Sequence, residues 1–501
     1  MLNHLKDATN ITQTENGANA HHTTKSFLLD FFATSGALRG NSGQFVQNFS
    51  KAYAEDYVAA TKLLFHCRDI RGGQGERENF RQGFKYLIHN DPKVAVAVMS
   101  LIPEYGRWDD IFVALGTELE NVMLHTIAEQ MVQDLENLEA GNISSISLLA
   151  KWLPSEKGNG KQRHPLVSTI LKTFNLTAKE YRKDLSSLRA AIDLVERKMS
   201  AREWDAINFN RVPSQALLKY RTAFYKQTDG RFEEWLDSKE SKIQAGTIAP
   251  HQIVNKIRMH NYDGALTSIW DNLPNWVSED DNTLVVVDTS GSMEASRYSQ
   301  VKPIDVAVGL GLYFAERNKG MFHNHFITFS RQPQLQQVIG KTIVEKVKNL
   351  LNAHWDQNTN LEAVFDLVLN TAVKNNLPQS ELPSRLVIIS DMEFDAATGT
   401  GYSWFNSPAE RTKGPLVSDI EKKWRGTGYK MPQLVFWNVD AKTSQFPINT
   451  DADNKILVSG FNPQIMQTIM SNEEWSPLTM MWEVVNQERY SAIGNAIDTT
   501  S

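Results

Sequence analysis

The chain has 501 residues, of which 41% are hydrophobic and 22% are charged, and its formal net charge is −6. This composition excludes a mainly disordered or fibrous protein, and the length suffices for about two to four domains. No run of about 18 uncharged apolar residues predicts a membrane-spanning helix, so we expect no membrane partner.

Residues 1–22 are rich in Asn, Thr and Gln and predict a disordered tail. This stretch lacks the apolar segment of a signal peptide. The one cysteine, Cys67, has no second cysteine with which to form an internal disulfide. Together these features favour a cytoplasmic protein in a reducing environment.

From residue 23 to about residue 270, apolar residues recur at the three- and four-residue spacing of amphipathic helices. The glycine-rich segment 71–77 interrupts two such runs. Serial helices with short breaks predict an α-solenoid of irregular repeats, although no repeat of fixed period occurs. The predicted helices include 57–65, 80–88, 94–102, 111–138, 145–153, 166–174, 186–199 and 213–225.

Beyond Pro274 the pattern changes to short apolar runs that alternate with helices. Strands that are apolar on both faces predict a buried parallel sheet, so residues 275–475 are interpreted as a doubly wound, Rossmann-like α/β domain. Residues 334–339 could form an antiparallel edge strand. In the C-terminal segment 476–501, Ser476-Pro477 predicts the start of a last helix, before a tail. The predicted parallel strands are 283–287, 322–329, 385–389, 433–438 and 456–458.

Oxygen-bearing side chains follow these strands at their carboxyl ends, where open α/β sheets bind ligands. Asp288, Ser290 and Ser292 follow the first strand, and Asp391 ends the strand at 385–389. Thr359 precedes a predicted helix. Carboxylates and hydroxyls suit a hard cation such as Mg²⁺ or another divalent ion. The alternative is that the hydroxyls only cap the following helix.

This Asp-x-Ser-x-Ser, Thr, Asp arrangement resembles the metal-ion-dependent adhesion site (MIDAS) of von Willebrand factor A domains. The resemblance implies that Ser290, Ser292 and Thr359 bind the metal directly, and that Asp288 and Asp391 act partly through water. It also implies an open coordination position, which takes a carboxylate from a partner protein.

Two features depart from that family. Met392 stands where the family has glycine after the second aspartate, and Glu393 and Asp395 follow closely. An internal carboxylate could therefore cap the metal and keep the site closed.

Long, unusual strings along the chain, among them those at 65–77, 103–110, 150–155 and 390–395, look like an uncharacterised domain-of-unknown-function family of plants, fungi and bacteriophages. The resemblance covers nearly residues 25–490. That family is similar in layout to the TROVE proteins, which include the Ro ribonucleoprotein. In those proteins a ring of HEAT-like helical repeats is closed by a von Willebrand A domain. Single-stranded RNA ends enter the central hole, and structured RNA lies on the basic outer face.

A basic segment, residues 151–226, carries 16 Lys and Arg against seven Asp and Glu. Such cations could contact RNA phosphates, with aromatic residues between them for stacking. A solvated helical face, paired with the acidic stretch before it, explains the segment equally well. The candidate RNA-binding residues are Lys151, Arg163, His164, Lys172, Arg182, Lys183 and Arg189.

Three arginines around the glycine-rich segment, Arg68, Arg71 and Arg77, form a second candidate anion site. Pairing of these arginines with Asp69, Glu76 and Glu78 would instead make them structural.

The sequence contains no HExxH or Gly-x-Ser-x-Gly motif and no other catalytic set, so we expect no enzyme. The leading hypothesis is a non-catalytic, Ro-like RNA-binding ring with Mg²⁺ in the A-type domain. It would bind a single-stranded end or a structured small RNA, with no DNA sequence specificity. The alternative is a metal-dependent protein–protein adaptor, for example for an AAA+ ATPase, or a phage-associated scaffold with no RNA role.

Overall fold

A computed structural model describes residues 9–156, 163–278, 282–296, 298–329, 332–351, 359–395, 415–442, 445–471 and 475–499. Within these ranges a helical region, residues 27–271, precedes a sheet domain, residues 283–470. Two further helices follow at the C-terminal end. This order agrees with the predicted change from a helical domain to an α/β domain.

Side chains at the helix starts define the first part of the helical region. The Ser26 hydroxyl accepts a hydrogen bond from the Leu29 N–H at 3.3 Å, and the Asp56 carboxylate accepts one from Ala59 at 2.9 Å. These caps satisfy donors that have no partner inside the helix. The elements are α2 (Phe27–Ser35), α3 (Ser42–Glu55), α4 (Tyr57–Arg68), α5 (Glu78–Asn90), α6 (Pro92–Met99) and α7 (Ile102–Tyr105).

The rest of the helical region is interrupted where the backbone turns left-handed. The predicted helix at 111–138 is divided into a 3-10 helix and a long α-helix, with Gly116 at φ +77° between them. The predicted helix at 186–199 is divided at Asp193, whose φ is +50°. The elements are η1 (Trp108–Ala114), α8 (Glu120–Glu139), η2 (Ile143–Ser145), α9 (Leu149–Trp152), α10 (Pro165–Thr173), α11 (Ala178–Ala191), α12 (Val195–Ala201), η3 (Trp204–Ala206), η4 (Phe209–Arg211), α13 (Ser214–Gln227), α14 (Arg231–Asp237), α15 (Pro250–Arg258) and α16 (Gly264–Asp271).

The sheet domain contains one six-stranded sheet in the order β5-β4-β3-β6-β7-β8. All neighbouring strands are parallel except β5, which pairs antiparallel with β4, as the sequence predicts for an edge strand. The strands are β3 (Thr283–Val287), β4 (His325–Thr328), β5 (Gln334–Gln337), β6 (Arg385–Ser390), β7 (Gln433–Asn438) and β8 (Lys455–Ser459). The helices and short 3-10 turns are η5 (Gly291–Glu294), α17 (Pro303–Arg317), α18 (Ile343–Leu351), α19 (Leu361–Asn375), η6 (Gln379–Glu381), α20 (Leu416–Arg425) and α21 (Ile465–Met470).

Both faces of this sheet are buried. Val285 and Val387 belong to an apolar cluster that contains residues of α17 and continues into the helical region. Val286 and Ile388 face the other way, into a second cluster with residues of α19 and α20. Alternate residues of each strand therefore pack against different layers, which explains why the strands are apolar throughout.

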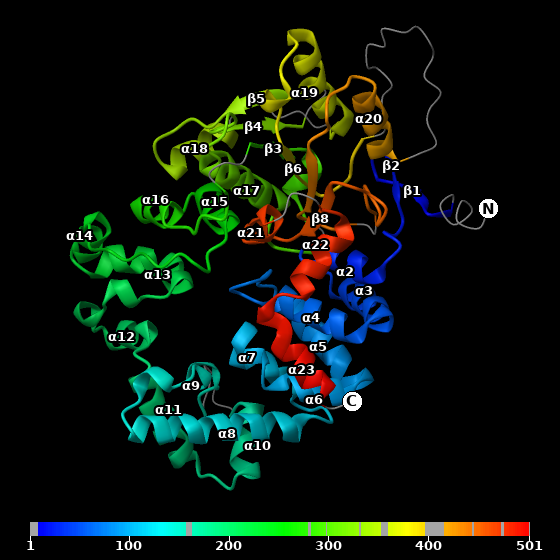
Figure 1. Cartoon of the computed structure of the whole chain (residues 1–501). Helices are drawn as coiled ribbons and strands as arrows, with labels where there is room; N and C mark the ends of the chain where they lie inside the picture. Colours follow the sequence, from blue (N-terminus) through cyan, green and yellow to red (C-terminus); the bar gives the residue numbers. More distant parts are fainter. Residues whose placement is uncertain are drawn as a thin grey trace.

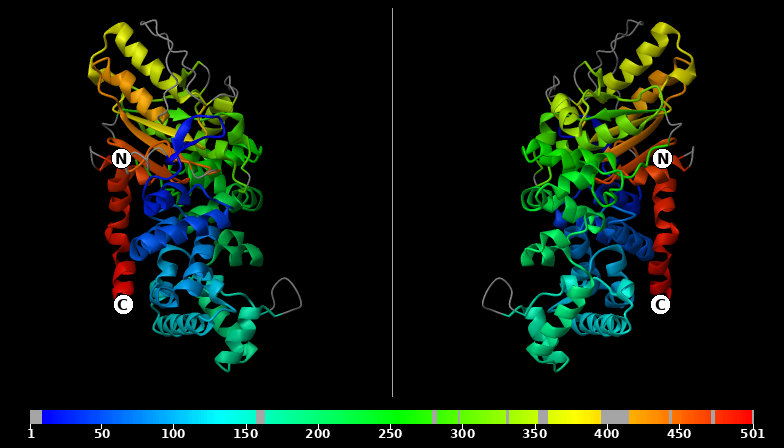
Figure 2. Two further views of the ribbon diagram at one scale, coloured as in Figure 1. Left: turned by 90° about the vertical axis from the view of Figure 1, so that its right-hand side faces the viewer. Right: turned by 90° about the vertical axis from the view of Figure 1, so that its left-hand side faces the viewer.

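The helical region meets the sheet domain at both of its ends. Helix α2 contacts β8, and α15 contacts α17, so the helices between them follow a curved path that starts and finishes on the sheet domain (Figure 1). The C-terminal helices α22 (Pro477–Val485) and α23 (Ser491–Asp498), with the 3-10 turn η7 (Glu488–Tyr490), run back along α4 and α6 (Figure 2). The chain thus closes a ring. Among the described helices, none has the length and apolar character that a membrane crossing requires.

The predicted C-terminal helix starts where expected, since the Ser476 hydroxyl accepts a hydrogen bond from the Thr479 N–H at 3.1 Å. The prediction of a disordered N-terminal tail is wrong for residues 9–22. Strands β1 (Ile11–Gln13) and β2 (Asn19–His21) form a hairpin, and His21 pairs with Phe446 of the sheet domain. These partners satisfy the hairpin backbone and bury Ala18 and Ala20, which the sequence composition alone does not reveal. Residues 1–8 lie outside the described residues.

The crossing of α15 and α17 depends on a glycine and an ion pair. A Cβ atom at Gly309 would lie 2.8 Å from the backbone nitrogen of His251, so the two helices approach closely only because that atom is absent. Nearby, the buried Asp305 carboxylate accepts hydrogen bonds from Asn255 and Arg258, each at 2.8 Å.

Replacing Gly309 by alanine should destabilise the protein by about 1–3 kcal/mol, because the added methyl overpacks this crossing. The control is Gly43→Ala in α3, where nothing lies within 4 Å of the added Cβ atom. Urea unfolding of both variants measures the difference. Equal stability of Gly309→Ala and wild type would show that the close approach does not constrain the fold.

Candidate functional site

Four of the five side chains predicted to bind a metal lie at the carboxyl ends of β3 and β6, which are neighbours in the sheet. The Ser390 hydroxyl donates to Asp288 at 2.6 Å, and the other Asp288 oxygen accepts from the Ser290 N–H at 2.9 Å. The hydroxyl oxygens of Ser290 and Ser292 are 3.0 Å apart. We call Asp288, Ser290, Ser292 and Asp391 the sheet-edge cluster.

A lysine that the sequence analysis missed joins this cluster. The Lys442 ammonium lies 2.5 Å from Asp391 Oδ2 and 3.1 Å from the Ser292 carbonyl oxygen. The side chains of Lys442 and Asp391 are 6% and 0% exposed. Burial, together with the nearby charge of Asp391, raises the pKa of Asp288 to about 6. The only sequence signal for Lys442 is its position, four residues beyond β7, which lies next to β6.

The oxygens of the sheet-edge cluster are of the kind that Mg²⁺ prefers, but the arrangement does not fit a divalent cation. The Lys442 ammonium contacts the Asp391 oxygen that such an ion would need, and its positive charge opposes a second cation. The magnesium site therefore stays a prediction of the sequence. In the structure, the Lys442 ammonium occupies the position beside Asp391 that the metal ion would take.

The backbone of Thr359, the remaining predicted site residue, is bound to Asp395, and the two carboxylates that follow Asp391 accept hydrogen bonds from backbone N–H groups. The Thr359 N–H donates to the Asp395 carboxylate at 2.9 Å, and the Asp395 N–H donates to the Thr359 carbonyl at 3.0 Å. The Glu393 carboxylate accepts from the Glu15 N–H at 2.7 Å, which attaches the N-terminal hairpin to the sheet domain.

The arginines of the basic segment are held by other groups. Arg163 pairs with the buried Glu156 at 2.8 Å, and Arg182 pairs with the other oxygen of the same carboxylate. Arg189 donates to the carbonyl oxygens of Ala150 and Leu153, at 2.8 and 2.6 Å. These three arginines stabilise the packing of α9 to α11.

Of the other four candidates, two are also engaged. Lys151 lies 3.6 Å from Glu196, and the His164 ring accepts a hydrogen bond from the Leu166 N–H at the start of α10. Lys172 and Lys183 are exposed. The structure thus leaves two lysines of this set on the surface for an external anion.

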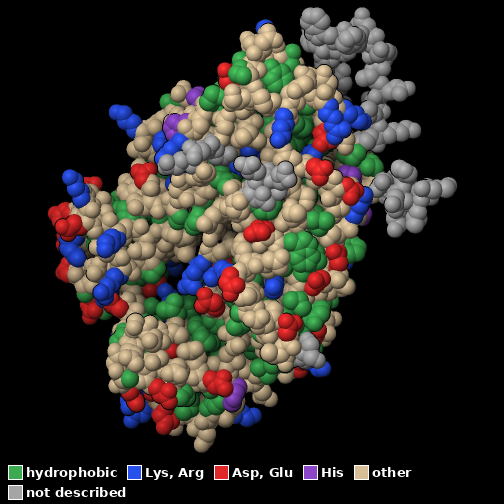
Figure 3. Space-filling view, viewed as in Figure 1, with side chains coloured by type: hydrophobic (Ala, Val, Ile, Leu, Met, Phe, Trp, Pro, Cys, Tyr) green, Lys and Arg blue, Asp and Glu red, His purple; other side chains and the backbone are tan. Residues whose placement is uncertain are grey.

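A cavity of about 540 Å³ lies inside the ring and opens to solvent. Its walls come from the loops that follow α2 and α4 and precede η1, from α13 and the start of α15 with the loop before it, and from the segment after β8. Figure 3 shows Lys and Arg side chains beside a hollow near the middle of this face. The charged residues that line it are Arg39, Arg68, Arg77, Arg107, Glu76 and Glu78. We call this space the arginine cavity.

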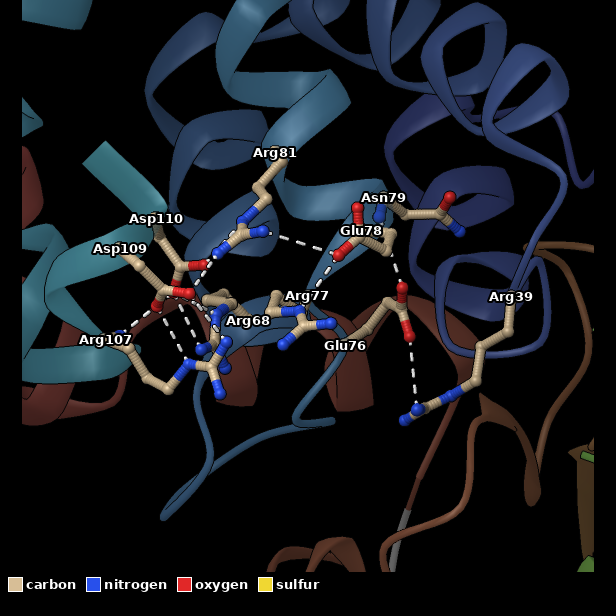
Figure 4. Close-up of polar contacts among 10 residues, drawn as sticks. All are labelled: Arg39, Arg68, Glu76, Arg77, Glu78, Asn79, Arg81, Arg107, Asp109 and Asp110. Atoms are coloured by element: carbon tan, nitrogen blue, oxygen red, sulfur yellow. Dashed lines mark hydrogen bonds and ion pairs between the residues drawn. The ribbon is translucent and has the colours of Figure 1, made fainter. Parts of the chain in front are cut away.

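Two of these arginines are fixed by aspartates of η1 (Figure 4). Arg68 is buried and binds Asp110 through two nitrogens, each 2.7 Å from the carboxylate. Arg107 binds Asp109 through two contacts of 2.9 Å and stacks on Trp152, 3.9 Å from the ring centre. Both arginines form part of the wall.

Of the other two arginines, only Arg77 retains free capacity for an anion. Arg39 pairs with Glu76 at 3.1 Å, donates to the Gln74 carbonyl at 2.8 Å and lies 4.2 Å from the centre of the Phe461 ring. Arg77 is 44% exposed and uses only its Nε–H, toward Glu78 at 2.9 Å, in the hydrogen bonds among described residues. Its two terminal nitrogens are therefore available to a ligand.

Arg68, Arg71 and Arg77, which the sequence predicts as one anion site, do not all lie together in the structure. Arg68 and Arg77 line the arginine cavity, whereas the exposed Arg71 lies 3.8 Å from Glu104. Asp69 binds Arg489 of the C-terminal segment. The glycine-rich segment was the sequence signal for this wall, but nothing in the sequence indicated the opposite wall.

Three residues that line the arginine cavity each have a buried polar atom without a hydrogen-bond partner among the described residues: Nε of Arg39, Oε1 of Gln74 and Nδ1 of His251. Burial, followed by the charge of Arg39, lowers the pKa of His251 to about 3. His251 is therefore neutral at physiological pH, and its ring stands edge-on to Phe461.

Two family profiles match the chain. The domain of unknown function DUF7788 matches residues 282–496, and the domain of unknown function DUF2828 matches residues 14–111 and 168–289. The predicted resemblance to proteins of unknown function is confirmed at this level.

One relative is the uncharacterized protein L728 of Acanthamoeba polyphaga mimivirus, which is 29% identical over 95% of this chain and 87% of its own length. A solved structure, that of the Deinococcus radiodurans RO (RSR) protein, is 11% identical with a TM-score of 0.35, over 92% of this chain and 93% of the other.

The buried His251 predicts a specific pH dependence. A histidine whose pKa is about 3 in the folded state and about 6.5 when unfolded takes up a proton only on unfolding within that interval. Its contribution to stability is therefore complete above pH 6.5 and decreases as the pH falls toward 3.

Between pH 3 and 6.5 the variant His251→Gln should reduce the slope of the unfolding free energy against pH. The reduction should correspond to the uptake of up to one proton fewer on unfolding. His125→Gln, at a side chain that is 76% exposed, is the control and should leave the slope unchanged. Urea unfolding at several pH values measures both. Identical slopes for His251→Gln and wild type would contradict a neutral, buried His251.

Proposed function

We propose that the protein binds single-stranded RNA in the arginine cavity and catalyses no reaction. The observation that carries this proposal is Arg77 on the cavity wall, which is 44% exposed and uses only its Nε–H in the hydrogen bonds among described residues. Phosphate contacts supply most of the affinity when proteins bind nucleic acid. Arg77, with both terminal nitrogens available, is the residue we expect to contact a phosphate directly.

The shape of the arginine cavity supports a chain-like ligand. The cavity opens to solvent and is lined on the far side by uncharged polar groups, including Gln215 and Gln252. Gln215 and Gln252 bind each other at 3.0 and 3.2 Å, so an unpaired base or a 2′-hydroxyl would exchange for one of these bonds. A basic wall opposite a neutral polar wall suits phosphates on one side and bases on the other.

The proposal includes a sheet domain of von Willebrand factor A type, a HEAT-like helical ring and a cytoplasmic location. The Asp288-to-Ser292 motif at the carboxyl end of β3 supports the first, and the contacts of α2 and α15 with the sheet domain support the second. The buried, unpaired Cys67 thiol agrees with a reducing compartment. A metal-bridged adaptor is the alternative, but Lys442 within the sheet-edge cluster counts against it.

The test is fluorescence anisotropy with a labelled oligouridine at several salt concentrations. Arg77→Glu should weaken binding and reduce the slope of log affinity against log salt by about 0.7, the value expected for one lost phosphate contact on a single strand. Arg425→Glu, at an 80% exposed arginine of α20, is the matched control and should leave affinity and slope unchanged.

A further variant separates the cavity from the outer surface. Lys172→Glu with Lys183→Glu reverses the two exposed lysines of the basic segment and should affect binding less than Arg77→Glu. Loss of binding in the lysine variant alone would place the RNA on the outer face. Absence of binding by the wild-type protein would reject the RNA-binding proposal.

A further inference from the structure

The sheet-edge cluster receives a positive charge from a third strand end. Strands β3, β6 and β7 are adjacent and parallel, so their carboxyl ends lie at one edge of the sheet. Asp288 follows β3 and Asp391 follows β6, whereas Lys442 comes from the segment after β7. Two acidic ends and one basic end thus meet at one position.

The backbone around Lys442 is held on two sides. The Val439 N–H donates to the Ser390 carbonyl at 3.0 Å, and the Ala441 N–H donates to the Ala37 carbonyl at 3.1 Å. The first bond ties the segment to β6, and the second ties it to the helical region just after α2. The backbone that carries Lys442 is therefore held in place by both the sheet domain and the helical region.

The surroundings of the ammonium are those of a buried cation. It contacts a carboxylate oxygen and a carbonyl oxygen, at 2.5 and 3.1 Å, while its side chain is 6% exposed. A lysine without a role at this edge could extend into solvent, since its long side chain favours a hydrated charge. Burial of the charge is stable here because Asp391 neutralises it.

We propose that Lys442 is a tethered cation that replaces a divalent metal at the sheet-edge cluster. Its ammonium bridges the end of β6 to the turn after β3, which is the task a metal ion would perform between the same two segments. The site is then closed both to metal ions and to a carboxylate from another protein. This inference concerns the sheet edge and does not depend on RNA binding in the arginine cavity.

The charges support replacement rather than coexistence. Asp288 and Asp391 together carry at most two negative charges, and Lys442 already neutralises one of them. A divalent ion between these carboxylates would lie within a few ångströms of the ammonium, where like charges repel strongly in a buried site. Metal binding therefore requires that Lys442 leave the cluster or lose its charge.

The experiment is a Mn²⁺ titration of the full chain by calorimetry, combined with thermal unfolding with and without Mn²⁺. The wild type should show no stoichiometric binding and no Mn²⁺-dependent change in Tm. Lys442→Met removes the charge, so it should bind one Mn²⁺ and show a Tm that rises with Mn²⁺ concentration. Lys442→Met combined with Asp288→Asn should lose that binding again, which separates the cluster from other surface sites.

Two further variants keep the test decisive. Lys455→Met removes another lysine of the sheet domain, whose side chain is 8% exposed and pairs with Glu421, and it should gain no Mn²⁺ binding. Lys442→Arg retains the charge and should stay without metal, which matters if Lys442→Met does not fold. Stoichiometric Mn²⁺ binding by the wild type that Asp391→Asn abolishes would overturn the proposal. Failure of a folded Lys442→Met to bind Mn²⁺ would overturn it as well.

Discussion

Both faces of the six-stranded, mostly parallel sheet are buried, and this requirement fixes where the helices of the whole chain lie. Helices α19 and α20 cover one face within the sheet domain, and α17 covers the other in a cluster that continues into the helical region. Because α2 and α15 also pack on the sheet domain, the helices between them must curve back to it. The ring and its cavity therefore follow from covering a sheet that has no polar face.

Local charge pairing decides which cations of this acidic chain can act on a ligand. Arg68 and Arg107 line the arginine cavity, yet each is held by an aspartate of η1, and Arg163 and Arg182 share the carboxylate of Glu156. Pairs of this kind hold loops and helices in place, since each planar guanidinium binds a carboxylate in a fixed direction. Charge density along the sequence is thus a weaker guide to a binding surface than the number of nitrogens left without a partner.

The two candidate sites differ in the sign of the charge that their side chains bring together. The arginine cavity collects positive charge from segments far apart in the chain, whereas the sheet-edge cluster collects negative charge and receives Lys442 as an internal cation. Both lie near the joint between the helical region and the sheet domain, because Ala441 is hydrogen-bonded to Ala37 and Phe461 contacts Arg39. Substitutions at that joint would therefore affect both sites together.

Local sequence patterns predicted the strands, most helices and the residue types at the strand ends. The apolar runs predicted the strands and the Ser476-Pro477 pair predicted a helix start, since hydrophobic period and helix capping are local properties. The expectation that parallel strands end at one edge of the sheet brought Asp288 near the end of β6. The folded chain was needed to show that residues 9–22 form a hairpin, that Arg163 and Arg182 are paired, and that Lys442 enters the cluster. Each of these outcomes depends on a partner distant in sequence, and no local pattern encodes which distant groups meet.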